Sequence, residues 1–83
     1  MKKENVYIKE CGQLVPIPQL KKYIFCGFYA AVGCNGSNAG DLFAVLSGPV
    51  LVPAFNASGK RLNVGSDKAG KSYSEKLNTW YNE

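Results

Sequence analysis

P-V-L-V-P-A-F, residues 49–55, is the clearest strand signal in the chain. It is a short apolar run in which prolines flank V-L-V, and valine is among the residues that favour strands. The run predicts a strand that is buried on both faces or lies at an interface. Residues 56–60, N-A-S-G-K, then indicate a turn, and R-L-N-V at 61–64 alternates as the returning strand of a hairpin does.

The segments before this hairpin also favour strands, although one of them has a helical alternative. L-F-A-V-L, residues 42–46, fits a short helix capped by Asp41 and fits a strand equally well. We prefer the strand because strands surround it. Residues 23–26 and 28–33 are rich in aromatic and β-branched types, and Gly27 separates them into two expected strands.

The N-terminal residues predict two extended segments joined by a bend. Residues 6–10 alternate as a short strand does, and C-G at 11–12 indicates the bend. Q-L-V-P-I-P, residues 13–18, is expected to be extended, because each proline fixes its own φ and disfavours helical backbone in the preceding residue. Pro16 and Pro18 have no backbone N–H, and in an extended chain both missing donors would lie on the same side. This arrangement suits an edge strand.

The last residues of the sequence predict a short α-helix over 72–81. S-Y-S-E at 72–75 has the spacing of a capping box. Four large side chains recur at helical spacing and would share one stripe: Tyr73, Leu77, Trp80 and Tyr81. Because a helix of about ten residues is marginal alone, we expect this stripe to dock on its own sheet or on a neighbouring subunit.

These elements predict a mainly β fold in a single domain covering residues 1–83. We expect a small antiparallel sheet or a partly open β-barrel with a short C-terminal α-helix. Hydrophobic residues make up 46% of the chain, which is enough for a globular core, and nine glycines and four prolines indicate frequent turns. A chain of this length buries only about 60% of its unfolded surface, so its core is thin, which favours self-association or a large partner.

Charge and hydropathy argue against nucleic acid and membrane as partners. The net charge is +4, but Lys and Arg are scattered along the chain and form no single basic patch, so nucleic-acid binding is not favoured. The most apolar stretch, residues 23–34, is too short for a membrane span of about 20 residues. No secretory signal is expected, because Lys2 and Lys3 are followed by Glu4 and Asn5 and not by an apolar run.

The chain offers few groups for catalysis or metal binding. It has no histidine, which removes the commonest general base, and its six carboxylates are spread singly. Three cysteines, which have no C-x-x-C spacing, are expected to be buried and reduced: Cys11, Cys26 and Cys34. We therefore expect no catalytic residue, no cofactor and no metal.

G-S-D-K-A-G-K-S, residues 65–72, matches the G-x-x-x-x-G-K-[ST] pattern of phosphate-binding loops. In such a loop Lys71 would meet the terminal phosphates and Ser72 would bind magnesium. The loop normally follows a strand buried on both faces, whereas the preceding R-L-N-V is polar at alternate positions. We interpret the match as a coincidental glycine-rich turn before the expected helix, although its fixed positions are all present: Gly65, Gly70, Lys71 and Ser72.

The stretch from Phe25 to Ala54 has a further pattern of strands and turns. An apolar strand ends at Gly33, a loop of small residues covers 34–39, and G-D leads into L-F-A-V-L. G-P-V and a strand ending in Pro53 follow. In this pattern the chain resembles the small cement or decoration proteins of tailed-phage capsids. C-G-Q-L-V-P-I-P and G-K-R-L-N-V resemble neighbouring strands of that family.

The resemblance implies a mechanical function. Proteins of that family form small β-barrels, often as trimers, and bind the outer face of an assembled shell where capsomers meet, which stiffens it. This chain would then be a non-enzymatic virion structural protein whose partner is a capsid protein or another protein, and which can itself form a homo-oligomer. Its location would be the virion, or the cytoplasm of a bacterial host before assembly.

Prolines and aromatic residues are the candidate protein contacts. Extended edges shaped by prolines can pair with a partner strand, and aromatic side chains are common anchors at interfaces. The candidates are Tyr7, Pro16, Pro18, Pro53, Phe55, Trp80 and Tyr81. Two alternatives stay open: a small phage or bacterial adaptor or inhibitor that binds another protein, and a small β-barrel nucleic-acid-binding protein. Against the second, the basic and aromatic residues are not interleaved on one strand, as base stacking would need.

Overall fold

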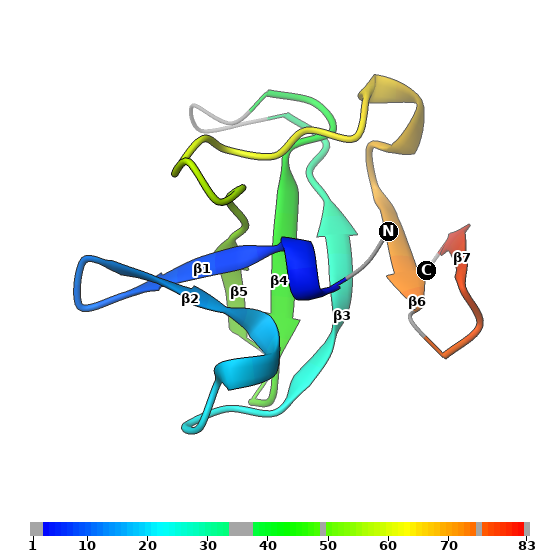
Figure 1. Ribbon diagram of the computed structural model, residues 1–83. Coiled ribbons are helices and arrows are strands. Elements are labelled where there is room, and N and C mark those ends of the chain that lie inside the picture. Colours follow the sequence, from blue (N-terminus) through cyan, green and yellow to red (C-terminus); the bar gives the residue numbers. More distant parts are fainter. Residues whose placement is uncertain (1–2, 34–37, 49, 75, 83) are drawn as a thin grey trace.

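The computed structural model describes residues 3–33, 38–48, 50–74 and 76–82, which form two antiparallel sheets (Figure 1). The smaller sheet contains β1 (Tyr7–Glu10) and β2 (Gln13–Pro16). The larger has the order β5-β4-β3-β6-β7, with β3 at Phe25–Ala30, β4 at Leu42–Leu46, β5 at Val50–Pro53, β6 at Lys71–Ser74 and β7 at Thr79–Asn82. Three short 3-10 turns are η1 (Lys3–Asn5), η2 (Ile17–Gln19) and η3 (Ser66–Lys68). The prediction of a mainly β fold is confirmed, and the described strands do not close into a barrel.

Strand β4 runs through the larger sheet and defines its two faces. L-F-A-V-L forms this strand, so the strand interpretation is confirmed and the helical alternative is wrong. Leu42, Ala44 and Leu46 are buried, whereas Phe43 and Val45 between them are half-buried. Because side chains alternate along a strand, the first three mark the core face of the sheet and the other two mark its outer face.

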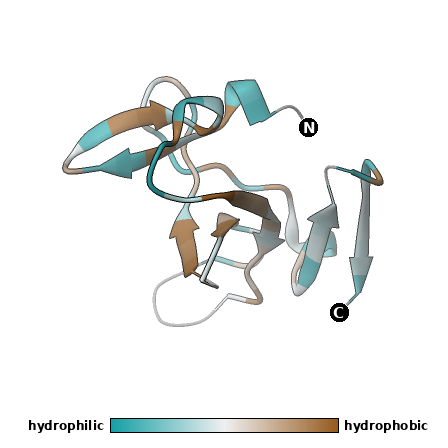
Figure 2. Ribbon diagram, turned by 90° about the horizontal axis from the view of Figure 1, so that it is seen from below, coloured by the Kyte–Doolittle hydropathy of each residue, from teal (hydrophilic) through white to brown (hydrophobic). Residues whose placement is uncertain are grey.

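The hydrophobic core lies between the core face of the larger sheet and the β1–β2 sheet, and the β1–β2 hairpin crosses over the strands of the larger sheet (Figure 1). Cross-strand neighbours form a row over the core face: Val52, Ala44, Phe28, Tyr73 and Trp80. Val6, Ile8 and Ile17 cover this row from the N-terminal part of the chain. In Figure 2 the central strands are coloured hydrophobic and the hairpin next to the C-terminus is paler and more hydrophilic.

The N-terminal hairpin forms the predicted bend at Cys11 and Gly12, which take left-handed φ values of 50° and 81°. Strand β2 confirms an extended backbone as far as Pro16, but the chain then turns into η2, so the extended interpretation is wrong for residues 17–18. The turn is favoured because Ile17 becomes buried and its N–H donates to the carbonyl oxygen of Val6 at 3.1 Å.

One strand replaces the two predicted in residues 23–33. Strand β3 passes through Gly27, with a bulge between Phe25 and Gly27 where its register against β4 shifts. A Cβ at Gly27 would lie 2.9 Å from the carbonyl oxygen of Tyr73 in β6. The glycine therefore permits the close approach of a neighbouring strand and does not divide the segment.

Strand β5 is an edge strand, so the prediction that residues 49–55 are buried on both faces is wrong. Val50 and Leu51 are 39% and 53% exposed, and Val52 is half-buried. An apolar run without alternation suits a strand covered on both sides, and here the residues that the structure describes provide a neighbour on one side only.

The turn at 56–60 is confirmed, and the returning strand predicted after it is wrong. Asn56 Oδ1 accepts two backbone N–H groups within the turn, at 2.9 and 3.0 Å. Residues 61–64 then make isolated bridges, at Arg61 and at Asn63, instead of a strand. Arg61 bridges to Phe55, and Asn63 bridges to Asp41 in the loop before β4. Because the partner segment changes between these two residues, no continuous ladder of strand pairing forms.

The predicted C-terminal helix is wrong, because β6 and β7 form a hairpin there. Tyr73 and Trp80, which the helical spacing would place on one stripe, are cross-strand neighbours whose ring centroids lie 5.3 Å apart. Asn78 takes φ 54° in the turn, and Glu75, the acidic residue of the predicted capping box, lies outside the described residues. Pairing of β6 with β3 joins this segment to the larger sheet, whereas a helix of about ten residues is marginal without tertiary packing.

Candidate protein-binding surface

Exposed hydrophobic side chains gather at one end of the larger sheet. Seven large hydrophobic side chains are exposed in the described part of the chain, and four of them belong to segments at one end of the larger sheet. These four, which we call the apolar end, are Tyr23, Ile24, Val50 and Leu51. Ile24 is 73% exposed, so this end of the sheet is not part of the core.

Ile24 and Ser47 hold the two halves of the apolar end together. The N–H of Ser47 donates to the carbonyl oxygen of Ile24 at 2.8 Å, and the N–H of Ile24 donates to Ser47 Oγ at 3.2 Å. Ser47 follows β4, and β5 then places Leu51 opposite Val45. The residues before β3 and the first residues of β5 therefore lie at the same end of the larger sheet, on either side of the end of β4.

A groove of about 280 Å3 lies next to the apolar end, between β1 and β5. Tyr7 and Phe55 exchange two backbone hydrogen bonds of 2.9 and 2.8 Å, and the pairing of β1 with this edge stops there. Past this pair the two strands are no longer bonded to each other, which leaves the groove between them. Ile8 and Leu46, both buried, contribute to its apolar lining.

Three charged side chains line the same groove: Lys9, Glu10 and Lys22. The amine of Lys9 lies 4.8 Å from the centroid of the Phe55 ring, and the guanidinium of Arg61 lies 5.8 Å from the same centroid. Such cation–π contacts are worth about 0.5–1 kcal/mol at exposed sites. The surroundings of the groove are therefore apolar, with more positive than negative charge.

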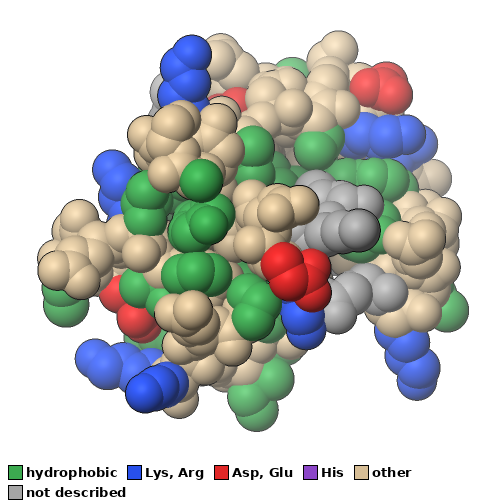
Figure 3. All heavy atoms as spheres, in the orientation of Figure 1, with side chains coloured by type: hydrophobic (Ala, Val, Ile, Leu, Met, Phe, Trp, Pro, Cys, Tyr) green, Lys and Arg blue, Asp and Glu red, His purple; other side chains and the backbone are tan. Residues whose placement is uncertain are grey.

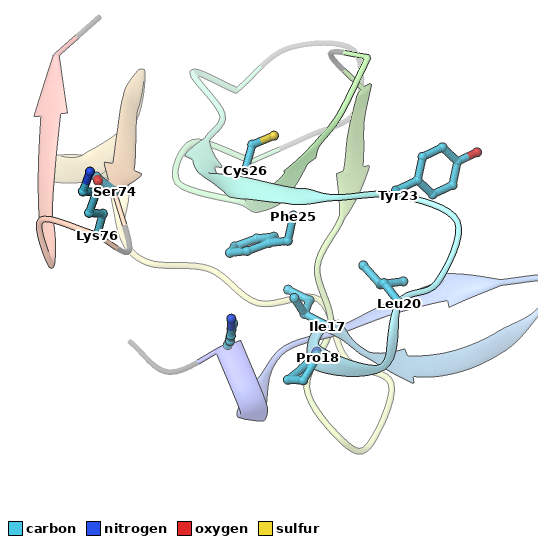
Figure 4. A pocket seen from close by; sticks show the side chains of 9 residues that line it. Ile17, Pro18, Leu20, Tyr23, Phe25, Cys26, Ser74 and Lys76 are labelled. Atoms are coloured by element: carbon cyan, nitrogen blue, oxygen red, sulfur yellow. The ribbon is translucent and has the colours of Figure 1, made fainter.

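A second hollow, of about 420 Å3, lies between η2 and the β6–β7 hairpin (Figure 4). Ile17, Leu20 and Phe25 form its apolar wall, and Ser74 and Lys76 stand on the opposite side. No carboxylate of the described residues lines it. It can hold an apolar group near an amine, but it pairs no acid with a base.

The charged side chains on the face seen in Figure 1 are spread out. Figure 3 shows hydrophobic side chains in the middle of this face and Lys and Arg side chains mostly around its margin. This distribution agrees with the scattered positions of the basic residues in the sequence. It differs from the concentrated basic face that nucleic-acid binding proteins usually present.

Three of the predicted contact residues lie near the groove. Tyr7 and Phe55 pair at its closed end and are both half-buried. Pro53 is exposed at the end of β5, where its cross-strand neighbour is Phe43.

The other predicted contact residues lie elsewhere. Trp80 packs half-buried against the core, and Tyr81 is 45% exposed on β7, at the opposite edge of the sheet from β5. Pro16 ends β2 half-buried, and exposed Pro18 lies beside the second hollow. The structure therefore does not bring the seven candidates into one surface.

Sequence reasoning named none of the four residues of the apolar end as a single contact residue, although it allowed that residues 49–55 lie at an interface. The available signal was V-L-V at residues 50–52, which is apolar without alternation and lies between prolines. For Tyr23 and Ile24 no comparable signal exists, because only the bonds to Ser47 place them beside β5.

Residues 65–72 do not have the geometry of a phosphate-binding loop. Lys71 and Ser72 begin β6, where a phosphate-binding loop would continue as a helix. The N–H groups of residues 68–70 donate to carbonyl oxygens of the chain at 2.8–3.1 Å, so they do not point at a ligand. Nucleotide binding at this segment is therefore not supported by its backbone.

The cysteines differ from expectation in their burial. Cys11 and Cys26 are exposed free thiols, so the prediction of burial is wrong for both, and Cys34 lies outside the described residues. Among the described residues no group of three His, Cys, Asp or Glu side chains is placed to hold a metal ion.

Asp41 is a buried carboxylate whose role is structural. The Asn63 side chain and the Asn38 N–H hydrogen-bond its oxygens and, with the charge of Arg61, lower its pKa, although burial opposes this. A carboxylate with a lowered pKa is a weak general base. Its hydrogen bonds instead hold two loops together.

The described helical segments are 3-10 turns of three residues each. None of the helices in residues 3–33, 38–48, 50–74 and 76–82 is long and apolar enough to cross a membrane. No family model, no curated protein and no solved structure matches this chain, so the surfaces described above carry the functional inference.

Proposed function

We propose that this chain is a non-enzymatic structural protein of a phage virion, which binds an assembled capsid shell as a cement or decoration protein and stabilises it. The observation that carries the proposal is the apolar end, where Tyr23, Ile24, Val50 and Leu51 are all exposed at one end of the larger sheet. Exposed apolar side chains that gather on one part of a small protein favour a contact with another macromolecule. The strand-and-turn pattern of the sequence resembles that of capsid decoration proteins, and this resemblance is the reason for proposing a capsid shell as the partner.

The size of this surface fits a protein that binds in many copies. Four large side chains with these exposures present roughly 400 Å2 of apolar area, taking about 200 Å2 for a fully accessible one. Burying that area is worth about 10 kcal/mol before the entropy of association is subtracted, and this entropy costs about 4–15 kcal/mol. One copy alone would bind weakly, whereas many copies on a shell add their contributions.

The alternative is a small phage or bacterial adaptor or inhibitor that binds one protein at one site. The apolar end and the adjacent groove would serve this function equally, without a shell. Copy number separates the two: a decoration protein is present in many copies per particle, and an adaptor is absent from particles or present in a few.

The test is mass spectrometry of purified particles from the source, followed by co-sedimentation of the pure protein with particles that lack it. We expect the polypeptide in the particles and saturable binding. Leu51→Lys and Ile24→Lys should lose binding at least about tenfold, because each places a charge in the contact. The matched control is Leu77→Lys, a 69% exposed leucine outside the apolar end. Absence from particles together with no co-sedimentation would contradict the proposal.

A further inference from the structure

Strand β5 has one unpaired edge whose backbone groups can be assigned. The N–H of Ala54 donates to Leu42, inside the sheet, and the N–H of Phe55 donates to Tyr7, outside it. Backbone groups of consecutive residues in a strand point to opposite sides. Leu51, four residues before Phe55, therefore directs its N–H and C=O away from β4.

The groove lies along one side of the strand to which Leu51 belongs. The groove between β1 and β5 is lined by Ile8, Leu46 and Val52, which lie on the core-face side of β5. On the other side of the strand, Leu51 and its neighbour Val45 lie on the outer face. A strand laid along β5 would place alternate side chains into the groove and over Leu51.

Pro53 restricts how such a strand can pair. It lies at the same parity as Leu51, so it offers its carbonyl to the open side but has no N–H to donate. The N–H of Leu51 is then the donor that an added strand must meet between residues 50 and 53. The proline also limits uncontrolled edge pairing, a common feature of edge strands in native proteins.

The charges beside the groove favour an acidic occupant. Two of the three charged residues that line it are lysines, Lys9 and Lys22, and the net charge of the chain is +4. Opposite charge on a partner strand would steer and orient it.

A second copy of this chain fits the same edge less well. It would bring another net charge of +4 to the contact, and the roughly 400 Å2 of the apolar end is about half of what one partner buries in a stable interface.

We propose that β5 accepts an extended segment of a partner protein, apolar at alternate positions and acidic overall, as a sixth strand of the larger sheet. Main-chain hydrogen bonds at Leu51 would supply affinity, and the groove would select alternate side chains. The proposal deepens the function proposed above and rests on it for one point, that the partner is a shell protein.

The test uses an eight-residue capped peptide that alternates valine and threonine and carries a glutamate pair at each end. Binding to the 15N-labelled protein is followed by NMR. We expect hydrogen exchange at the Leu51 amide to slow at least about tenfold in the complex. The Val52 amide, whose N–H faces β4, should change little. The same peptide with lysines in place of the glutamates should bind more weakly at low salt.

Leu51→Pro is the decisive variant, because it removes an N–H that points away from the sheet and is tolerated at an edge position. It should bind the peptide at least about tenfold more weakly. Leu51→Ala keeps the N–H, so it should lose binding by only a few-fold. A native-like spectrum of each variant checks folding, and the exchange measurement on the wild-type chain decides the question if Leu51→Pro does not fold.

No peptide binding, or binding without protection of the Leu51 amide, would overturn strand addition. Normal decoration of particles by folded Leu51→Pro would also overturn it, while leaving shell binding intact. If the protein binds the peptide but is absent from particles, the shell is not the partner, and the proposal that β5 accepts an added strand still holds.

Discussion

Asn63 donates a hydrogen bond from Nδ2 to Asp41 Oδ1 at 3.0 Å and so joins two segments that are 22 residues apart in the sequence. Asp41 is 9% exposed, and its other oxygen accepts the N–H of Asn38 at 3.0 Å. Asn63 Oδ1 in turn accepts the N–H of Gly65 at 2.8 Å. The carboxylate therefore fixes the loop before β4 against the segment that leads to β6.

The Asp41–Asn63 contact predicts a loss of stability in acid. Because the Asn63 hydrogen bond lowers the pKa of Asp41 below its ordinary value of 3.8, the stabilisation is complete above pH about 5 and is lost as the pH falls through the folded pKa. Urea unfolding between pH 7 and pH 2.5 should show this decline. In Asp41→Asn the decline should be smaller, and an unchanged decline in that variant would contradict the assignment.

A second prediction concerns Gly40, which the same loop brings against Gly65. Gly40 has φ 88°, and a Cβ there would overlap the carbonyl group of Gly65. Gly40→Ala should therefore destabilise the fold by about 3 kcal/mol or more, through overlap and left-handed strain together. Gly12→Ala is the matched control: its φ is 81°, but nothing lies within 4 Å of the added Cβ, so about 1 kcal/mol is expected. Equal losses in chemical denaturation would show that the close approach is unimportant.

The C-terminal hairpin predicts losses of stability of different size for two adjacent aromatic residues. Trp80 packs its ring on Tyr73 at 5.3 Å and contacts the core, whereas Tyr81 is 45% exposed on the outer face. Trp80→Ala should lower the free energy of unfolding by about 2–4 kcal/mol, and Tyr81→Ala by less than about 1 kcal/mol. A helix would place both residues on one stripe, so similar losses would favour it.

The backbone geometry of residues 65–72 predicts no nucleotide binding, although the sequence matches the phosphate-loop pattern. The N–H groups of residues 68–70 are bonded within the chain, and Lys71 lies in a strand. Calorimetry with ATP and Mg²⁺ should detect no binding at millimolar concentration, and Lys71→Ala should behave as the wild type does. Phosphate-dependent heat that disappears in Lys71→Ala would establish a nucleotide site.

The scattered charge predicts weak retention on polyanions. The net charge is only +4, and the Lys and Arg residues are scattered along the sequence. The protein should therefore elute from heparin at low salt, below about 0.2 M. Retention well above that concentration would favour the nucleic-acid-binding alternative over both protein-binding functions.

Local chemistry was sufficient to predict those elements whose cause lies within a few residues. The bend at Cys11-Gly12 follows from its composition and the turn after Phe55 from N-A-S-G-K, whereas L-F-A-V-L is predicted as a strand only because strands surround it. The candidate site was found only in outline. Pro53 was selected for its edge position, but Leu51 was assigned to a strand either buried on both faces or at an interface, and was not named as a contact.

Periodicity failed where two structures share one spacing. Tyr73 and Trp80 are seven residues apart, which suits one stripe of a helix and equally suits opposite positions in a hairpin. The choice depends on β3, which offers Phe28 opposite Tyr73 and a free edge for pairing. That partner lies 45 residues earlier, and no local pattern encodes it.

The amino-acid sequence by itself determined that the chain is β-rich, that its turns lie at glycines, asparagines and prolines, and that its charge is mild and dispersed. These properties follow from backbone preferences and composition, which are local. Only the tertiary structure decided which apolar residues are covered: Leu46 is buried and Leu51 is exposed, although both belong to apolar runs. The physical reason is that burial depends on which strand receives a neighbour on each side, and β5 receives only one among the described residues.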